Sequence, residues 1–293
     1  MTMTTAKKTS KAKPFLKWAG GKGQLIDEID ARLPRQRMES GEVDRYVEPF
    51  VGGGAVFFHI CQTYDSIRRF YLLDINGDLV KCYKAIRENV EKVIDALERL
   101  ESKYLATKDE GRRDFYYWVR DGFNSDRDPA KLIFLNKTCY NGLYRVNKNN
   151  EFNVPFGNYT KPKICDRDNL FAVARVLEKA IIKSGDFTHS EQHITKKTLV
   201  YVDPPYDPLS QTASFTSYSK GSFSEGDQRR LAAFYKKMSG RGAQVLLSNS
   251  GTDLVRDLYR EFRAENVFVG RSINCLGNKR GKIVEVLVRN YEC

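Results

Sequence analysis

The chain has 293 residues, 41% of them hydrophobic and 12% aromatic, which excludes wholesale disorder and allows one large domain or two ordinary ones. Lys and Arg number 49 against 37 Asp and Glu, and this formal net charge of +12 favours a polyanionic partner, nucleic acid before membrane. A basic enzyme without such a partner fits the charge equally well, so composition leaves both classes open.

No apolar run reaches the roughly 18 residues of a membrane helix, and the N-terminal residues lack the apolar stretch of a signal peptide. We therefore expect a cytoplasmic protein without a membrane partner. The six cysteines show no CxxC spacing and there are only three histidines, so we expect free thiols and no metal site. Residues 1–13 contain four lysines and no acid, which predicts a disordered basic tail.

The chain beyond this tail opens with the pattern of a doubly wound α/β sheet. Residues 46–47 predict a short strand, and the glycines at 52–54 predict a tight turn. Residues 56–60 predict the start of a helix, and residues 70–73 a second strand that ends at Asp74.

Residues 79–105 change to helical periodicity, with one apolar face and charged residues on the others. Further helical patterns cover residues 115–123 and 130–135. Residues 140–159 then alternate between apolar and polar on either side of the polar cluster 147–150, which predicts a β-hairpin.

Strands and helices alternate again after Asp166. The predicted elements are strands at 199–202, 244–247 and 283–288 and a helix at 228–238. We therefore predict an α/β domain made of residues 14–76 and 166–293. A mostly helical insert, residues 77–165, interrupts it.

The first candidate site is the glycine turn at 52–54. Glycines let the backbone approach a ligand closely, and Asp74 follows Gly54 by 20 positions, the spacing of a carboxylate that holds ribose hydroxyls. Phe57 replaces the third glycine of a GxGxxG motif, which argues against a nicotinamide cofactor and favours a nucleoside without a pyrophosphate. A tight turn beside an exposed carboxylate fits this pattern equally well.

The second candidate site, Asp203-Pro204-Pro205-Tyr206, directly follows an apolar strand. The two prolines cannot donate ladder hydrogen bonds, so they end the strand and stiffen the turn. The Asp203 carboxylate and the Pro204 carbonyl then form a pair of fixed acceptors beside the ring of Tyr206. This arrangement suits the exocyclic amine of a planar base, which donates two hydrogen bonds while its ring stacks.

Three motifs, FLKWAGGK, PFVGGG and DPPY, occur along the chain in the order typical of one enzyme family. With YNGLYRVN, EFNVPFGNY and the LLSNS strand, they make nearly the whole chain similar to the DNA adenine-N6 methyltransferases of the Dam type (D12 class). The resemblance implies a Rossmann-like catalytic domain at 14–76 and 166–293. It also implies that the insert 77–165, with its hairpin at 140–159, is the DNA-recognition domain.

The resemblance implies S-adenosyl-L-methionine as cofactor. The implied cofactor-binding residues are Trp18, Ala19, Gly20, Lys22, Phe50, Gly52, Asp74, Ile75, Asp186, Phe187 and Asp203. Asp74 would hold the ribose hydroxyls, and Ile75 would pack on the adenine. Asp186 and Phe187 would bind the adenine edge. The Gly20-Gly21-Lys22 turn is not a phosphate loop, because Leu16 and Gly23 replace residues that a Walker motif requires.

The hairpin region between residues 136 and 163 holds five basic residues and one acid, with aromatic residues interleaved. The resemblance implies DNA contacts from Lys17, Tyr140, Asn141, Leu143, Arg145, Pro155 and Tyr159. In it, Lys17 and Arg145 read guanines and Tyr140 wedges into the target site. Together they suggest 5′-GATC-3′. For Phe152 and Phe156 we instead expect packing against the helical insert.

We therefore predict a monomeric enzyme that flips an adenine out of double-stranded DNA and methylates its N6 directly. Asp203, Pro204, Pro205 and Tyr206 would form its catalytic turn. No Pro-Cys nucleophile motif is present, as ring-carbon methylation would require. Cytosine-N4 methylation and a non-catalytic DNA-binding regulator remain as alternatives, and both restriction-associated and solitary methylases fit these motifs.

Overall fold

The computed structural model describes residues 10–108, 110–206, 223–269 and 283–293. The chain divides into two compact units. We call them the helical unit (10–19, Gly52–Gly54 and Gly77–Lys179) and the sheet unit (Gly20–Val51, Ala55–Asn76 and Ala180–Cys293). None of the helices within the described ranges is long and apolar enough to cross a membrane.

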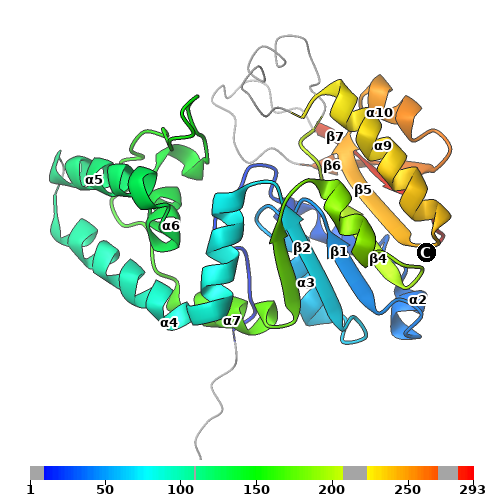
Figure 1. The fold of residues 1–293 in the computed structure, drawn as a ribbon, viewed down its shortest axis with the longest axis horizontal. Helices are drawn as coiled ribbons and strands as arrows, with labels where there is room; N and C mark the ends of the chain where they lie inside the picture. The colour runs from blue at the N-terminus through cyan, green and yellow to red at the C-terminus, as the bar shows by residue number, and fades with distance from the viewer. Residues whose placement is uncertain (1–9, 109, 207–222, 270–282) are drawn as a thin grey trace, which may run out of the picture. The chain divides into compact units, whose positions relative to one another are not determined.

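The strands of the sheet unit form a seven-stranded sheet in the order β3-β2-β1-β4-β5-β7-β6 (Figure 1). They are β1 (Arg45–Glu48), β2 (Arg69–Asp74), β3 (Ala180–Ser184), β4 (Thr198–Val202), β5 (Gln244–Ser250), β6 (Arg263–Val269) and β7 (Ile283–Arg289). The first five in this order pair in parallel, whereas β7 is antiparallel to β5 and β6. The predicted α/β sheet is thus confirmed as a mixed sheet, and the sequence patterns missed β3 and β6.

Helices cover both faces of this sheet (Figure 1). The helices of the sheet unit are η1 (Lys22–Gln24), α1 (Ile26–Asp30), α2 (Arg35–Glu39), α3 (Ala55–Thr63), η3 (Phe187–His193), α9 (Glu225–Gly240) and α10 (Asp253–Leu258). On one face, Val47 and Leu247 belong to a buried cluster with Leu231 of α9. On the other face, Phe70 of β2 contacts the ring of Phe57 of α3. Every residue of β4 and β5 is buried, as expected for central strands covered on both sides.

The strand order reverses between β1 and β4, which are neighbours in the sheet. Strands β2 and β3 continue from β1 in one direction, and β5 continues from β4 in the other. The carboxyl ends of these parallel strands therefore lie along one edge, where open α/β sheets bind ligands. Glu48 ends β1 and Asp74 ends β2, while Asp203 directly follows β4.

The helical unit consists of α4 (Gly77–Ala106), α5 (Glu110–Asp126), α6 (Pro129–Thr138), η2 (Tyr140–Gly142) and α7 (Arg167–Leu177). The helix predicted over 79–105 is confirmed, with a break at Asn89, whose backbone leaves the helical region and whose side chain accepts from Lys92 N. Asp128 caps α6 by accepting from Lys131 N, and Pro129 occupies the first turn.

The predicted hairpin is looser than two continuous strands. Its legs meet at two isolated antiparallel bridges, Cys139 with Phe156 and Val146 with Phe152. Asn124 of α5 holds one leg, because its side chain both accepts from Phe152 N at 2.7 Å and donates to Phe152 O at 3.1 Å. Phe152 is buried, and Phe156 packs against the ring of Tyr116, so the expected packing of these two rings on the helical insert is confirmed.

Residues 10–13, which we predicted to be disordered, are fixed to α7, whereas residues 1–9 of that tail lie outside the described residues. Asn169 makes two hydrogen bonds to Lys13, accepting from its backbone N at 3.0 Å and donating to its carbonyl at 3.1 Å. Ala12 is buried. The prediction of disorder is wrong for residues 10–13 because the Asn169 side chain binds both backbone polar groups of Lys13. A local charge pattern does not reveal such a tertiary contact. The division into catalytic and recognition domains stays a prediction.

Candidate active site

The carboxylate of Asp203 is held in place by two donors at the end of β4. Lys22 Nζ lies 2.9 Å from Asp203 Oδ1, and Ser248 Oγ donates to the same oxygen at 2.9 Å. The side chains of Lys22 and Asp203 are only 6% and 17% exposed. Burial raises the pKa of Asp203 above its ordinary value, and the lysine and the serine oppose this rise.

Lys22 connects three parts of this site. It lies in η1, and its ammonium also donates to the carbonyl of Gly20 at 2.6 Å. The same Nζ lies 4.7 Å from the centre of the Tyr206 ring. We predicted Lys22 as a cofactor-binding residue, and the structure brings its side chain to Asp203 and Tyr206.

The turn after Asp203 is held from both ends. Gln228, fully buried in α9, donates to the carbonyl of Pro205 at 3.1 Å and itself accepts from Asn249 Nδ2 at 3.1 Å. At the far end, the hydroxyl of Tyr206 donates to Glu285 Oε2 at 2.5 Å. Side chains from β5, β7 and α9 therefore fix a turn whose own residues can make few backbone hydrogen bonds.

The predicted nucleoside-binding residues lie at neighbouring strand ends of the sheet unit. The amide of Gly185 donates to the carbonyl of Asp74 at 3.0 Å, which places the segment containing Asp186 beside the end of β2. Ile75 is 75% exposed, an unusual position for a large apolar side chain and one available to a flat ligand.

Asp186 and Phe187 already have partners inside the sheet unit. The Asp186 carboxylate caps η3 at Thr188 and accepts from Arg230 at 3.1 Å. Burial alone would raise the pKa of Asp186, but the hydrogen bonds from Thr188 and Arg230 bring it below the ordinary value. The ring of Phe187 stacks on Phe50, with 5.5 Å between ring centres.

Two other predicted cofactor residues, Trp18 and Gly52, meet in the helical unit. A Cβ on Gly52, which has φ +47°, would come within 3.0 Å of Trp18 Cδ1, so the indole requires a glycine there. The ring of Tyr144 also packs on this indole, with 5.5 Å between ring centres, and its hydroxyl donates to Asp78. Ala19 and Gly20 are exposed, and between them the chain passes from the helical unit to the sheet unit.

Lys17 lies beside the hairpin because Asn136 joins the two segments. The buried amide of Asn136 accepts from Lys17 N at 2.8 Å and donates to the carbonyls of Lys17 and Gly142. Gly142 has φ +64°, and a Cβ there would collide with the Lys17 side chain. The exposed ammonium of Lys17 lies 5.0 Å from the centre of the Tyr159 ring.

The remaining predicted DNA contacts occupy both legs of the hairpin. Tyr140 N donates to the carbonyl of Pro155 at 2.9 Å, which pairs the legs. The side chains of Tyr140 and Leu143 are 49% and 40% exposed, despite being large and apolar. Asn141 is also exposed and has a positive φ of 55°. These side chains are thus available to a partner.

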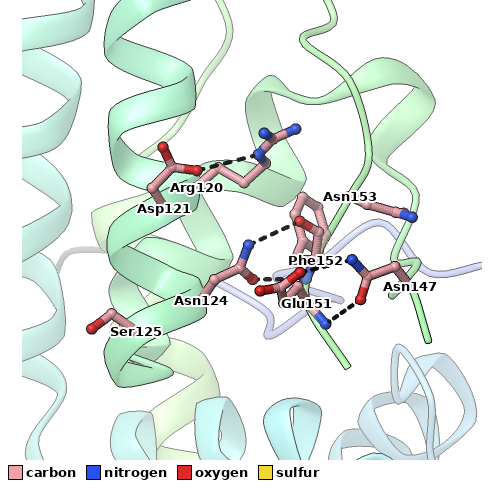
Figure 2. A pocket seen from close by; sticks show the side chains of 8 residues that line it. All are labelled: Arg120, Asp121, Asn124, Ser125, Asn147, Glu151, Phe152 and Asn153. Carbon is pink, nitrogen blue, oxygen red and sulfur yellow. Dashed lines mark hydrogen bonds and ion pairs between the residues drawn. The ribbon is translucent and has the colours of Figure 1, made fainter. Parts of the chain in front are cut away.

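Arg145 is exposed but has a fixed direction. Its Nε donates to Asn153 Oδ1 at 2.7 Å, and a second guanidinium nitrogen donates to the carbonyl of Asn153 at 3.2 Å. Asn153 also lines an open hollow of about 450 Å³ between α5 and the hairpin. Figure 2 shows this hollow, where Asn124 holds the backbone of Phe152 and the side chain of Asn147 is bonded to Glu151.

Ser248, Glu285, Gln228 and Asn136 were not among the predicted site residues. One sequence signal was available for Glu285, because it interrupts an otherwise apolar predicted strand. Ser248 ends the apolar run of β5, where polar groups of an α/β sheet collect. No local pattern distinguishes Gln228 or Asn136 from other polar helix residues.

Comparison with known proteins identifies relatives over almost the full chain. The family model for D12 class N6 adenine-specific DNA methyltransferases matches residues 18–273. The type II methyltransferase M.MjaIII of Methanocaldococcus jannaschii is 47% identical over 95% of this chain and 99% of its own. M1.LlaDCHI, a type II methyltransferase of Lactococcus lactis subsp. cremoris, is 35% identical over 95% of each chain.

The DNA adenine methylase of Escherichia coli K12 is also similar, at 36% identity over 94% of this chain and 95% of its own. The predicted enzyme class is thereby confirmed, and the cytosine-N4 and non-catalytic alternatives are set aside. This chain belongs to the D12 class of N6 adenine-specific DNA methyltransferases.

Proposed function

We propose that this enzyme uses S-adenosyl-L-methionine to methylate N6 of an adenine flipped out of double-stranded DNA, within 5′-GATC-3′, and that it acts as a monomer. The observation that carries the proposal is the largely buried Asp203 carboxylate, fixed by Lys22 and Ser248 beside the ring of Tyr206. Such a site matches a flat base with an amino group at its edge.

Both contacts that fix the carboxylate end on Oδ1 of Asp203. We therefore assign Oδ2 of Asp203 and the carbonyl of Pro204 as acceptors for the two N6 protons, while Tyr206 stacks on the base. By accepting both N6 protons, these two groups raise the electron density on the nitrogen and make it a better nucleophile toward the methyl group. No strong base is required, because the nitrogen becomes acidic only once it has formed its new bond, and Asp203 is already in place to receive the proton.

The residues at the strand ends fit an S-adenosylmethionine molecule. Asp74 offers a carboxylate to a ribose diol, and exposed Ile75 offers an apolar surface to an adenine ring. Asp186 would accept from the adenine amine with the lone pairs that Arg230 and Thr188 leave unused. The other assigned residues are Trp18, Ala19, Gly20, Lys22, Phe50, Gly52, Phe187 and Asp203. The bound cofactor would supply an activated methyl group from its sulfonium.

Arg145 and Lys17 support the GATC assignment. The guanidinium of Arg145 is exposed and oriented by Asn153, and arginine is the residue best suited to bidentate contact with guanine O6 and N7. Exposed Lys17 is held beside Gly142 and Tyr159. Tyr140, which is large and exposed, is the residue we assign to fill the space left by the flipped base.

Replacing Asp203 tests the proposed chemistry. We expect Asp203→Ala to lose methyl transfer to a GATC duplex, measured with labelled S-adenosylmethionine, while equilibrium binding of the cofactor changes by less than about tenfold. Glu225→Ala, which removes an exposed carboxylate from the first turn of α9, is the matched control. Substantial turnover by Asp203→Ala would refute the mechanism.

A further inference from the structure

We propose that Glu285 is a positioning residue for methyl transfer: it fixes the ring of Tyr206 in the orientation that stacks on the flipped adenine. The inference rests on the role proposed above for Tyr206. Glu285 bonds to the phenol, and its hydrogen bond reaches the far end of the ring, where a small displacement would tilt the whole stacking face.

Glu285 projects from the strand where the sheet turns antiparallel. It lies on β7 opposite Ser250 of β5, and the three residues that follow it are buried. A partly buried carboxylate in such an apolar strand costs free energy unless a donor satisfies it. The Tyr206 hydroxyl, 2.5 Å from Oε2, is that donor.

The Tyr206 ring needs this contact because its position depends on two side-chain torsions. Gln228 fixes the preceding peptide by donating to the Pro205 carbonyl, but this bond leaves the ring torsions free. Lys22 Nζ lies over the ring at 4.7 Å, a non-directional attraction. A hydrogen bond at the phenol oxygen fixes the first torsion, because that torsion moves the oxygen. It restrains the second torsion, which turns the ring about an axis through the oxygen, because a phenol O–H prefers the plane of its own ring. A ring held in advance avoids the ordering cost at the moment the base enters.

The charges around Glu285 favour this hydrogen bond. Burial raises the pKa of Glu285, and the nearby Asp203 carboxylate adds to the rise, while Tyr206 and Lys22 oppose it. Burial also raises the pKa of Tyr206 far above its ordinary value, so the phenol keeps its proton and remains the donor. Glu285 thus acts on the reaction through Tyr206.

Four variants test the proposal: Glu285→Ala, Glu285→Gln, Tyr206→Phe and the double variant Glu285→Ala/Tyr206→Phe. The amide oxygen of Gln still accepts from the phenol, so Glu285→Gln is the conservative control. Glu261→Ala, an exposed acid of the same unit, is the matched surface control. Single-turnover rate, KM for DNA, thermal midpoint and the fluorescence of 2-aminopurine at the target position are measured for each.

We expect Glu285→Ala and Tyr206→Phe to lower the single-turnover rate by similar factors, about 10- to 100-fold, with KM for DNA within about threefold. The double variant should be no slower than the slower single variant, because each single substitution already removes the same hydrogen bond between Tyr206 and Glu285. Glu285→Gln should stay within about threefold of wild type. In Glu285→Ala, the fluorescence of 2-aminopurine should still rise when the base flips. It should reach a higher level than in the wild-type complex, because the less firmly held Tyr206 ring quenches it less.

The inference would be overturned by a Glu285→Ala rate within twofold of wild type, by additive losses in the double variant, or by a Gln variant as impaired as Ala. If Glu285→Ala fails to fold, Tyr206→Phe and Glu285→Gln still decide between these outcomes. An inactive wild-type enzyme on GATC duplexes would instead refute the proposed function, so the two failures are distinguishable.

Discussion

Replacing Lys22 by methionine should make methyl transfer strongly pH-dependent. The substitution keeps most of the side-chain volume but removes the ammonium 2.9 Å from Asp203. Breaking a buried ion pair by removing one partner costs about 3–5 kcal/mol, because it leaves an uncompensated charge. Part of this cost would be relieved if the Asp203 carboxyl bound a proton.

The direction and size of the effect follow from the pKa of Asp203. Burial already raises it, and Lys22 is the largest opposing influence. A cost of about 3 kcal/mol corresponds to about two pKa units at roughly 1.4 kcal/mol per unit. We therefore expect the pH–rate profile of the variant to move to higher pH by about two units. The variant should be severalfold slower than wild type at neutral pH, because more of its Asp203 is protonated, and should regain much of the loss as pH rises.

Single-turnover rates between pH 6 and pH 9.5, with labelled S-adenosylmethionine and saturating DNA, test this prediction. Lys237→Met in α9 removes an exposed lysine of the same unit and should leave the profile unchanged. A Lys22→Met enzyme that keeps more than a third of the wild-type rate at neutral pH would refute the reasoning. So would a variant whose profile is lowered uniformly without moving to higher pH.

Three further predictions concern other parts of the chain. Gln228→Leu should lower the free energy of unfolding by about 1–3 kcal/mol in urea titrations, because the carbonyl of Pro205 loses its buried donor. Glu265→Gln should lower the free energy of unfolding by about 1–2 kcal/mol at pH 7, a value discounted for solvent exposure. Hydrogen bonds, first from Arg289, lower the pKa of Glu265 to about 2, so the carboxylate stabilises the fold fully above about pH 4.5. The difference in unfolding free energy between the variant and wild type should therefore shrink as pH falls toward about 2. Arg145→Ala should reduce discrimination against a changed guanine by about 1–3 kcal/mol in competition methylation assays, whereas an unchanged preference would contradict its proposed role.

The sheet was predictable where strands are buried on both faces. Continuous apolar runs mark β4 and β5, and the sequence placed both. The missed strands, β3 and β6, are the two ends of the sheet order. Edge strands carry polar and exposed residues, such as Lys183 in β3, so neither a continuous run nor a clean alternation marks them.

The residues of the candidate site likewise include some that local sequence was enough to predict and others that depend on the folded chain. Asp203 and Tyr206 stand in one contiguous motif, so local chemistry was enough to select them. Ser248 and Glu285 reach this motif from β5 and β7, and their proximity depends on sheet order and register, which no local pattern encodes. Lys22 was selected from the resemblance, but its pairing with Asp203 emerged only from the folded chain.

The most direct test of the account is methyl transfer from labelled S-adenosylmethionine to two DNA duplexes that differ only in whether GATC is intact or scrambled. The products are digested to nucleosides and identified by mass spectrometry. The account predicts label in N6-methyladenine and only from the GATC duplex. Equal label from both duplexes would contradict the roles of Lys17 and Arg145, and the absence of label from both would contradict the proposed cofactor and chemistry.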